Sequence, residues 1–382
     1  MAQYLVVFAV AAGVTAAAVP FVRRMAVRHG AVVHPDDRRV HKVPTPTLGG
    51  AAMFAAFVVA MAVAWQMPAF RLAFEGSEPL GVVVGAAVIF GVGFLDDVRD
   101  VSAPAKVAGQ VLAAGVLSIL GVTMWYFRVP FTGRSFIALS PDIIPLVCAL
   151  WVVVMANAVN LVDGLDGLAA GIVAIAAAAF YLYSVQLAQI GSVTPDNAGP
   201  LIAAVAFGCC VGFLPHNFHP ARIFMGDAGA MLLGLLMAAT TMSVVGQSGS
   251  GFSGRTYFFY APIFIPFFIL GIPISDTAFS IVRRAAGVRS GRGGIATADK
   301  NHLHHRLMRL GHGQTRSVLI LWAWTALLSA LVLVPVLTNS GTGFIPAAVA
   351  ALGVALYTLF APRGRAAREQ VSPDLRAEQR VP

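Results

Sequence analysis

Acidic and amide side chains recur every three residues inside an otherwise apolar stretch of the chain. The segment 157–171 reads NAVNLVDGLDGLAAG and contains Asn157, Asn160, Asp163 and Asp166. Polar groups at membrane depth are costly and usually mark a functional site. On a straight α-helix the first and last of them would point in opposite directions, because each step of three residues drifts by about 60°. Gly164 and Gly167 therefore predict a non-helical turn in which the polar groups converge. Polar contacts between helices would explain a single Asn, but explain two amides and two acids poorly.

A second group of acids ends another apolar run, in the sequence GFLDDVRD. It contains Asp96, Asp97 and Asp100, and Lys106 follows. Three acids this close repel one another unless a cation or a basic side chain joins them. Oxygen ligands of this kind suit Mg²⁺, which is often shared with substrate phosphates. If the helix continues for a turn, Asp96 and Asp100 share one face. A solvated helix end is the other reading that the motif leaves open.

A third acid, Asp227, stands at the start of a further apolar run, after PHNFHPARIFMG. It would act there as a helix N-cap, or join the other acids in a site. Phe224 offers a face on which a base could stack, or an anchor at the membrane interface. Asn217 supplies the donor and the acceptor that reading a base edge requires.

The longest basic segment, 283–316, contains the sequence DKNHLHHRL. Its candidate binding residues are His302, His304, His305 and Arg306. Their spacing is not that of the common zinc sites, and no Cys or acid pair accompanies them. We therefore expect this cluster to bind anionic phosphate.

The elements that must position these residues are membrane helices. The chain of 382 residues is 58% hydrophobic and only 11% charged, whereas soluble domains are about 25% charged. About 20 apolar residues span a bilayer, and no polar segment is long enough to form a large soluble domain. We expect an all-α integral membrane protein with eleven spans, at 3–22, 48–66, 80–95, 104–124, 142–158, 167–187, 199–214, 228–246, 259–282, 317–337 and 343–361. The first span lacks a preceding basic segment and is expected to be a retained helix, not a cleaved signal peptide.

The distribution of basic residues predicts how the chain crosses the membrane. Six alternate segments carry 22 of the 26 Lys and Arg residues, namely 23–47, 96–106, 157–166, 215–227, 283–316 and 362–382. Basic loops stay in the cytoplasm, so the N-terminus is expected outside and the C-terminus inside. The net charge of +9 is then a topology signal and not a sign of nucleic-acid binding. We expect one transmembrane domain over 1–361, with its catalytic loops in the cytoplasm, and a disordered tail over 362–382.

The candidate residues all fall on the predicted cytoplasmic side. Acids for Mg²⁺, groups for a nucleobase and a basic arm for phosphate suit a nucleotide substrate, and a membrane pocket suits a lipid co-substrate. The chemistry implied is phosphoryl transfer, in which positioning and charge neutralisation do most of the catalysis. The alternative from another class is a multi-spanning transporter whose acids relay protons or cations. It would place acids on both sides of the midplane, and the outer half of this chain is nearly bare of them.

Five motifs in order give the chain a resemblance to a known family. They are PTPTLGG (44–50), FLDDVRD (94–100), NAVNLVDGLDGLAAG (157–171), HNFHPARIFMGDAG (216–229) and DKNHLHHRL (299–307). The chain closely resembles the bacterial polyprenyl-phosphate N-acetylhexosamine-1-phosphate transferases, which start wall, O-antigen and teichoic-acid polymers on a lipid carrier. The resemblance implies transfer of GlcNAc-1-phosphate from UDP-GlcNAc to undecaprenyl or decaprenyl phosphate. It also implies Mg²⁺ or Mn²⁺, a plausible homodimer and a bacterial cytoplasmic membrane. The phospho-MurNAc-pentapeptide transferases are the second branch, with a differently composed His motif.

The resemblance also implies roles for individual residues. Asp227 matches a Mg²⁺ ligand, Asp96 and Asp97 match paired acids that engage the metal or the lipid phosphate, and Lys106 matches a phosphate-binding lysine. The uridine pocket would comprise Gly164, Leu165, Asp166, Asn217 and Phe224. The three histidines would recognise the sugar. From the sequence itself we expect Arg306 to bind phosphate, Asp163 to serve the phosphate end, and Asn160 to contact substrate or, with Asn157, to brace the turn. Ala230 departs from the family's usual Ser. Single and double displacement both remain open.

Overall fold

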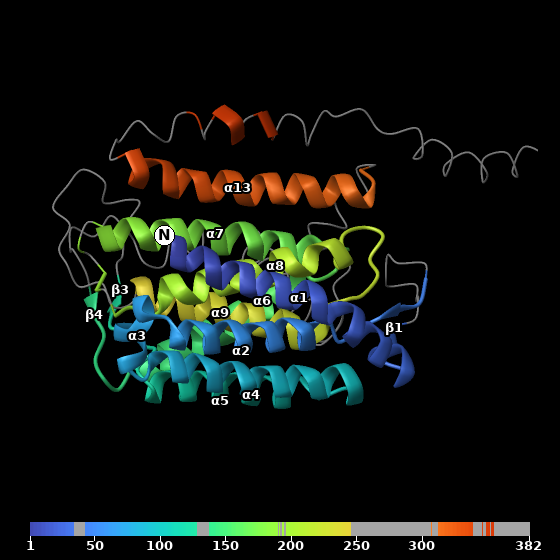
Figure 1. Cartoon of the computed structure of the whole chain (residues 1–382), viewed down its shortest axis with the longest axis horizontal. Helices are drawn as coiled ribbons and strands as arrows, with labels where there is room; N and C mark the ends of the chain where they lie inside the picture. Colours follow the sequence, from blue (N-terminus) through green and yellow to red (C-terminus); the bar gives the residue numbers. More distant parts are fainter. Residues whose placement is uncertain are drawn as a thin grey trace, which may run out of the picture.

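The computed structural model describes residues 1–33, 43–127, 137–245 (apart from 190, 192 and 195), 307, 312–338, 346, 349–351, 353 and 354. In this part of the chain the long helices pack side by side as a bundle (Figure 1). The long helices are α1 (Ala2–Arg28), α2 (Gly49–Gln66), α4 (Glu78–Arg99), α5 (Ala103–Ile119), α6 (Ile144–Val162), α7 (Leu168–Gln189), α8 (Gly199–Asn217), α9 (Gly226–Val245) and α13 (Gln314–Thr338).

Short elements connect some of these helices. They are the strands β1 (Val32–Val33), β2 (Thr45–Pro46), β3 (Tyr126–Phe127) and β4 (Ile137–Ala138), the 3-10 turn η1 (Pro68–Phe70) and the helix α3 (Arg71–Glu75). The strands form two antiparallel hairpins, β1 with β2 and β3 with β4. Two-residue strands carry too little periodicity to be expected from sequence.

Eight of the described helices are long and apolar enough to cross a membrane, and α5, with 17 residues, is shorter. This architecture is consistent with an integral membrane protein. Nine of the eleven expected spans coincide with a described helix, with ends that differ by a few residues. The expected span 259–282 lies outside the described residues, and only scattered residues of 343–361 lie inside them.

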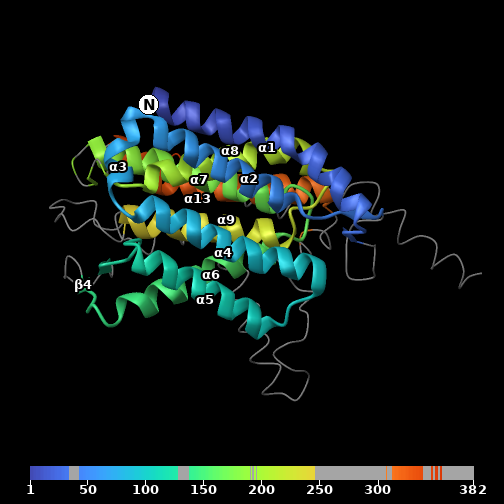
Figure 2. The same ribbon diagram turned by 60° about the horizontal axis from the view of Figure 1, so that its bottom comes forward.

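Helix α9 occupies the centre of the bundle. It packs against α2, α4, α6, α7 and α8, and 94% of its apolar stretch within Gly226–Val244 is buried. Figure 2 shows α9 with α4 and α6 alongside it. A helix that is apolar all round must be enclosed by others, and α9 has this composition apart from Asp227 in its first turn and three buried hydroxyl residues near its other end, Thr240, Thr241 and Ser243. Asp227, the single acid of α9, therefore lies in the first turn of this central helix.

Glycines let other helices approach α9 closely. A Cβ on Gly50 of α2 would stand 2.6 Å from the Cα of Gly229, and one on Gly93 of α4 would stand 2.5 Å from the Cα of Ala228. The backbone N–H of Gly50 also donates to the carbonyl of Met225 at 2.8 Å. The second glycine of PTPTLGG therefore permits the close approach of the α9 backbone.

Four of the segments expected on one side of the membrane meet at one end of the bundle. Arg23 Nε donates to the carbonyl of Arg222 at 3.0 Å, and the N–H of Phe224 donates to the carbonyl of Pro46 at 2.8 Å. Segment 96–106 joins them through Lys106, and segment 157–166 lies directly before Gly167, whose N–H bonds to the 215–227 segment. Residues distant in sequence are thus gathered around the start of α9.

Candidate active site

Three helices bring a polar side chain to Asp227, the first acid of α9. Lys106 from α5 pairs with Asp227 Oδ2 at 2.9 Å and also with Asp96 from α4. Asn160 from α6 donates its Nδ2 to the same oxygen of Asp227 at 3.2 Å. Four helices, α4, α5, α6 and α9, therefore converge on one cluster of acid, amide and ammonium groups. The cluster is half-buried and lies where the helices end.

Asp97 caps the first turn of α9. Its Oδ1 accepts the N–H of Asp227 at 2.8 Å, and its Oδ2 accepts the N–H of Ala228 at 3.1 Å. The first N–H groups of a helix have no partner within it, and a carboxylate there is favoured by both hydrogen bonding and the helix dipole. Gly226 leads into this turn with a φ of +71°. Asp97 thus sets the orientation of the residue that bears the Asp227 carboxylate.

Asp96 joins α4 to α5. Its Oδ1 accepts the N–H of Val101 at 2.7 Å, and its Oδ2 pairs with Lys106. The expected repulsion between neighbouring acids is therefore relieved by a basic side chain. Asp100 adopts a left-handed conformation (φ +50°) that ends α4, and it is exposed. Asp96 and Asp100 were expected to share a face only if the helix continued, and this condition is not met because α4 ends at Arg99.

The non-helical turn after Asn157 begins later than expected. Helix α6 continues to Val162, so Asn157 and Asn160 lie in its last turns, and the break starts at Asp163. Gly167, with φ +75°, completes it. A polar side chain need not end a helix when neighbouring helices supply its hydrogen-bond partners, as they do here. For the same reason, Asp96 and Asp97 lie within α4 and not in the loop that was expected to start there.

Two polar residues tie this turn to the segment before α9. Asn217, only 2% exposed, accepts the N–H of Gly167 at 3.0 Å and donates to the carbonyl of Ile223 at 2.9 Å. Asp166 Oδ2 pairs with His219 Nδ1 at 2.7 Å and accepts the N–H of Ala221 at 3.1 Å. These bonds hold the turn after α6 and the segment before α9, the two braced loops, against each other. His219 was not singled out from the sequence, since a His before Pro carries no pattern that predicts its partner.

The carboxyl group of Asp163 interacts electrostatically with the acids at the start of α9 and with Asp166. Burial raises the pKa of Asp163 to about 7, and the charges of Asp227, Asp97 and Asp166 add to that shift. The side chain keeps some contact with solvent, but protein surrounds most of it. A carboxyl with such a pKa exchanges its proton near neutral pH.

The remaining predicted site residues fall at different depths. Gly164 is exposed, Leu165 is buried and Phe224 is half-buried. The backbone of Phe224 is held on both sides, by Pro46 and by the N–H of Gly49 at 2.9 Å. Their roles in a uridine pocket stay predictions. His302, His304, His305 and Arg306 lie outside the described residues.

The donor set at Asp227 fits Mg²⁺ in its usual mode. Among the described residues, no group of three or more His, Cys, Asp or Glu side chains forms a complete cage. Mg²⁺ is commonly held by one or two carboxylates together with substrate phosphates. Asp227 fits this role better than Asp97, because both oxygens of Asp97 already accept backbone hydrogen bonds.

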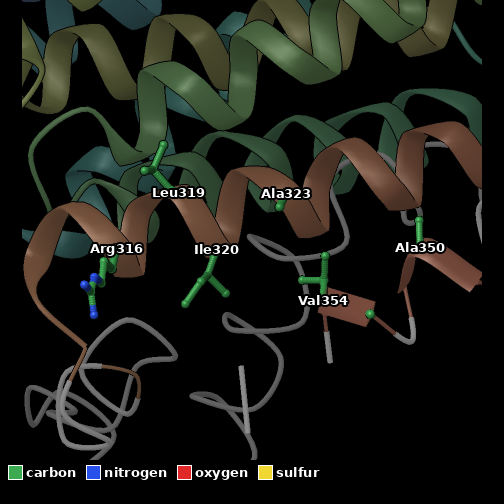
Figure 3. Close-up of a pocket in the computed structure, with 7 residues that line it drawn as sticks. Arg316, Leu319, Ile320, Ala323, Ala350 and Val354 are labelled. Atoms are coloured by element: carbon green, nitrogen blue, oxygen red, sulfur yellow. The ribbon is translucent and has the colours of Figure 1, made fainter. Parts of the chain in front are cut away.

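A cavity of about 320 Å³ lies elsewhere, along α13 (Figure 3). Its lining is apolar except for Arg316. None of the acids or amides described above lines this cavity, so it is not part of the cluster around Asp227.

Comparison with known proteins identifies the family. Residues 79–245 match the model of glycosyl transferase family 4. The chain is 40% identical over 332 residues to the decaprenyl-phosphate N-acetylglucosaminephosphotransferase of Mycobacterium tuberculosis, covering 83% of this chain and 80% of that protein. A probable undecaprenyl-phosphate N-acetylglucosaminyl 1-phosphate transferase of Bacillus subtilis is 36% identical, with 79% and 76% covered. A phospho-N-acetylmuramoyl-pentapeptide-transferase of Desulforudis audaxviator is 32% identical, with 82% and 91% covered. The motifs, the helical bundle and these similarities together show that the chain belongs to glycosyl transferase family 4, among the polyprenyl-phosphate N-acetylhexosamine-1-phosphate transferases.

Proposed function

We propose that this protein transfers GlcNAc-1-phosphate from UDP-GlcNAc to a polyprenyl phosphate, undecaprenyl or decaprenyl, and releases UMP. This would be the first membrane step of a cell-envelope polysaccharide. The structural observation that carries the proposal is the meeting of Asp96, Lys106 and Asn160 around Asp227. The substrates are taken from the names of the relatives that are 36–40% identical to this chain.

The reaction balances without a net proton transfer. An oxygen of the polyprenyl phosphate forms a bond to the β-phosphorus of UDP-GlcNAc. The bond from that phosphorus to the bridging oxygen breaks, and UMP leaves with the electron pair. A phosphate monoester has a second pKa of about 6, so the acceptor is largely a dianion at neutral pH. Repulsion between anions is then the main obstacle, and charge neutralisation is the main task of the site.

The chain's own residues divide that task. The ammonium group of Lys106, which contacts Asp227, can also pair with phosphate oxygens. Asn160 of α6 fixes the Asp227 carboxylate by donating a hydrogen bond to it. We propose that Asp227 binds Mg²⁺, with Asp96 beside it, and that Mn²⁺ can substitute. When bound, the metal would offset the charge of the two phosphates. Asp97 would serve by orienting the start of α9, and Asp163 by holding a proton near the phosphates.

The nucleotide is proposed to lie beside the two braced loops. Gly164 leaves the backbone open to a ligand, and Phe224 offers a half-buried ring. Asp166 and Asn217 would shape this pocket by fixing its walls. The segment with His302, His304, His305 and Arg306 is proposed to bind the sugar phosphate.

In the membrane we propose eleven spans, with the N-terminus outside and the active site facing the cytoplasm of a bacterium. The support is the placement of 22 of the 26 Lys and Arg residues in alternate segments. Contacts among four of those segments, through Arg23, Pro46, Lys106 and Asp166, agree with their lying on one side.

The test is an assay with purified protein in lipid nanodiscs. Labelled UDP-GlcNAc and polyprenyl phosphate should give a lipid-linked sugar and an equal amount of UMP, only when Mg²⁺ or Mn²⁺ is present. UDP-MurNAc-pentapeptide is the competing donor, because relatives named for that transfer are 32–33% identical to this chain. Turnover of the pentapeptide nucleotide alone would replace the proposed substrate. Full activity of Asp227→Asn would contradict the metal assignment.

A further inference from the structure

A second polar contact joins three helices below the acids. Asn157 of α6 donates its Nδ2 to Gln110 Oε1 of α5 at 2.7 Å, and Gln110 Nε2 reaches Met231 Sδ of α9 at 3.3 Å. Gln110 is only 1% exposed. The same nitrogen of Asn157 also contacts the carbonyl of Val153 at 2.8 Å, within α6. A buried amide in this setting holds a specific arrangement of helices, because its groups have few other partners.

The two sets of contacts form layers that repeat helix by helix. The upper layer is Lys106, Asn160 and Asp227, which meet at one oxygen of Asp227. The lower layer is Gln110, Asn157 and Met231, which meet at Gln110. Each helix supplies one residue to each layer, at a spacing of three or four residues. Side chains with this spacing lie on one face of a helix, one turn apart.

We propose that Gln110 and Asn157 are positioning residues for the transfer reaction. Their bond fixes the rotation and the axial register of α5 and α6 against α9. Lys106 and Asn160 lie on those same faces, so this register is what lets both reach the same oxygen of Asp227. The role in catalysis rests on the proposed function, whereas the effect on Lys106 is a property of the structure alone.

Removing the hydrogen bond between Asn157 and Gln110 should loosen the contacts of Lys106 and Asn160 with Asp227 without unfolding the bundle. In Gln110→Leu the side chain keeps a similar volume, but the Asn157 amide loses its acceptor. A misplacement of about 1 Å at a reacting centre can reduce the rate by roughly 100-fold. We therefore expect kcat to fall by about 100-fold while the KM for UDP-GlcNAc changes much less, because the two loops proposed to hold the nucleotide are not altered.

A matched control is available between two of the same helices. Trp151 Nε1 of α6 donates to Thr241 Oγ1 of α9 at 2.7 Å, near the opposite end of the pair. Thr241→Val removes this interhelical bond far from the acids. It should lower the melting temperature about as much as Gln110→Leu does, yet leave kcat unchanged. The exchanged pair Gln110→Asn with Asn157→Gln keeps one amide on each helix and should recover at least about tenfold of the lost kcat.

A second readout does not depend on the substrate. The chain has three lysines, Lys42, Lys106 and Lys300, as the printed sequence shows. Acylation of each, followed by mass spectrometry on the full-length protein, reports how firmly its ammonium group is held. Relative to Lys42, the reactivity of Lys106 should rise several-fold in Gln110→Leu and stay at the wild-type level in Thr241→Val.

The outcomes separate this inference from the proposed function. If Lys106 is released but UDP-GlcNAc is not turned over by any form of the protein, the positioning holds and the proposed substrate fails. If Gln110→Leu keeps the wild-type kcat and the wild-type Lys106 reactivity, the inference is overturned. Equal losses of kcat in Gln110→Leu and Thr241→Val would also overturn it, because a general loss of packing would then explain both.

Discussion

Gly226 gives a sharp test of how Asp97 holds the start of α9. Its φ of +71° lies in the left-handed region. A Cβ at this position would stand 2.6 Å from Asp97 Oδ1, well inside normal contact distance. Gly226→Ala therefore imposes two separate costs, one on its own backbone and one on the carboxylate that caps α9.

Both costs can be estimated. A non-glycine residue in the left-handed region costs roughly 1–2 kcal/mol. Displacing the Asp97 carboxylate breaks at least one of its two bonds to backbone N–H groups, and a hydrogen bond to a charged group contributes about 1.5–3 kcal/mol. The sum is about 2.5–5 kcal/mol, which corresponds to a fall in melting temperature of roughly 3–6 °C for a chain of 382 residues.

The assay is thermal unfolding in detergent, followed by fluorescence, together with the transfer assay. Gly91→Ala is the matched control, because Gly91 lies in α4 with Asp97 and a Cβ there meets nothing within 4 Å. This control should melt at or slightly above the wild-type temperature, since Ala favours a helix over Gly by about 0.5–1 kcal/mol.

A double-mutant cycle then separates the two costs. In an Asp97→Ala background the added methyl group has no carboxylate to displace, so Gly226→Ala should cost only the backbone term of roughly 1–2 kcal/mol. Strictly additive effects of Gly226→Ala and Asp97→Ala would refute the account, because they would mean that Asp97 does not hold the first turn of α9.

Three further predictions concern other parts of the site. Burial raises the pKa of Asp163 from its ordinary value of 3.8 to about 7, so the folded state loses stability as pH rises from about 4 to 7. The gain in melting temperature of Asp163→Asn over wild type should therefore be larger at pH 8 than at pH 5, and a difference that is the same at both values would contradict this. Asn217→Ala leaves the N–H of Gly167 and the carbonyl of Ile223 without their partner and should cost about 1–3 kcal/mol, measured by thermal unfolding, with a higher KM for the nucleotide. Gly50→Ala would force α2 away from α9, since its Cβ would stand 2.6 Å from the Cα of Gly229. Size-exclusion chromatography of this variant in detergent should therefore show aggregation. The control Gly13→Ala, whose Cβ would meet nothing within 4 Å, should elute as wild type does.

The helices were predictable because burial in a bilayer leaves a long apolar signal in the sequence. Their polar ends were not. Helix α6 runs on through Asn157 and Asn160, and α4 runs on through Asp96 and Asp97. An apolar pattern stops where lipid or core contact stops, whereas the backbone hydrogen bonds continue as long as neighbouring helices satisfy the side chains. The sequence therefore predicted these helices but placed their polar ends about a turn too early.

The site was predictable in residue types but not in partners. Asp97 was expected to engage the metal or the lipid phosphate, which stays a prediction, and the contacts of its oxygens with the N–H groups of Asp227 and Ala228 were not foreseen. Gln110 and His219 were missed, because each has a partner about 50 residues away along the chain. A motif records which side chains are present. It does not record which backbone groups, brought by another helix, those side chains will meet.

The charges in the cluster connect the geometry to the proposed cation. Asp96, Asp97 and Asp227 bring three acids together, and Lys106 is the basic side chain paired with two of them. The backbone N–H groups at the start of α9 offset the charge of Asp97, but Asp96 and Asp227 share a single ammonium. Two anionic phosphates could not approach such a site without further positive charge. The excess of acid over base is thus the physical basis for proposing a divalent cation here, and Lys106 pairs with Asp96 and Asp227 and not with the already capped Asp97.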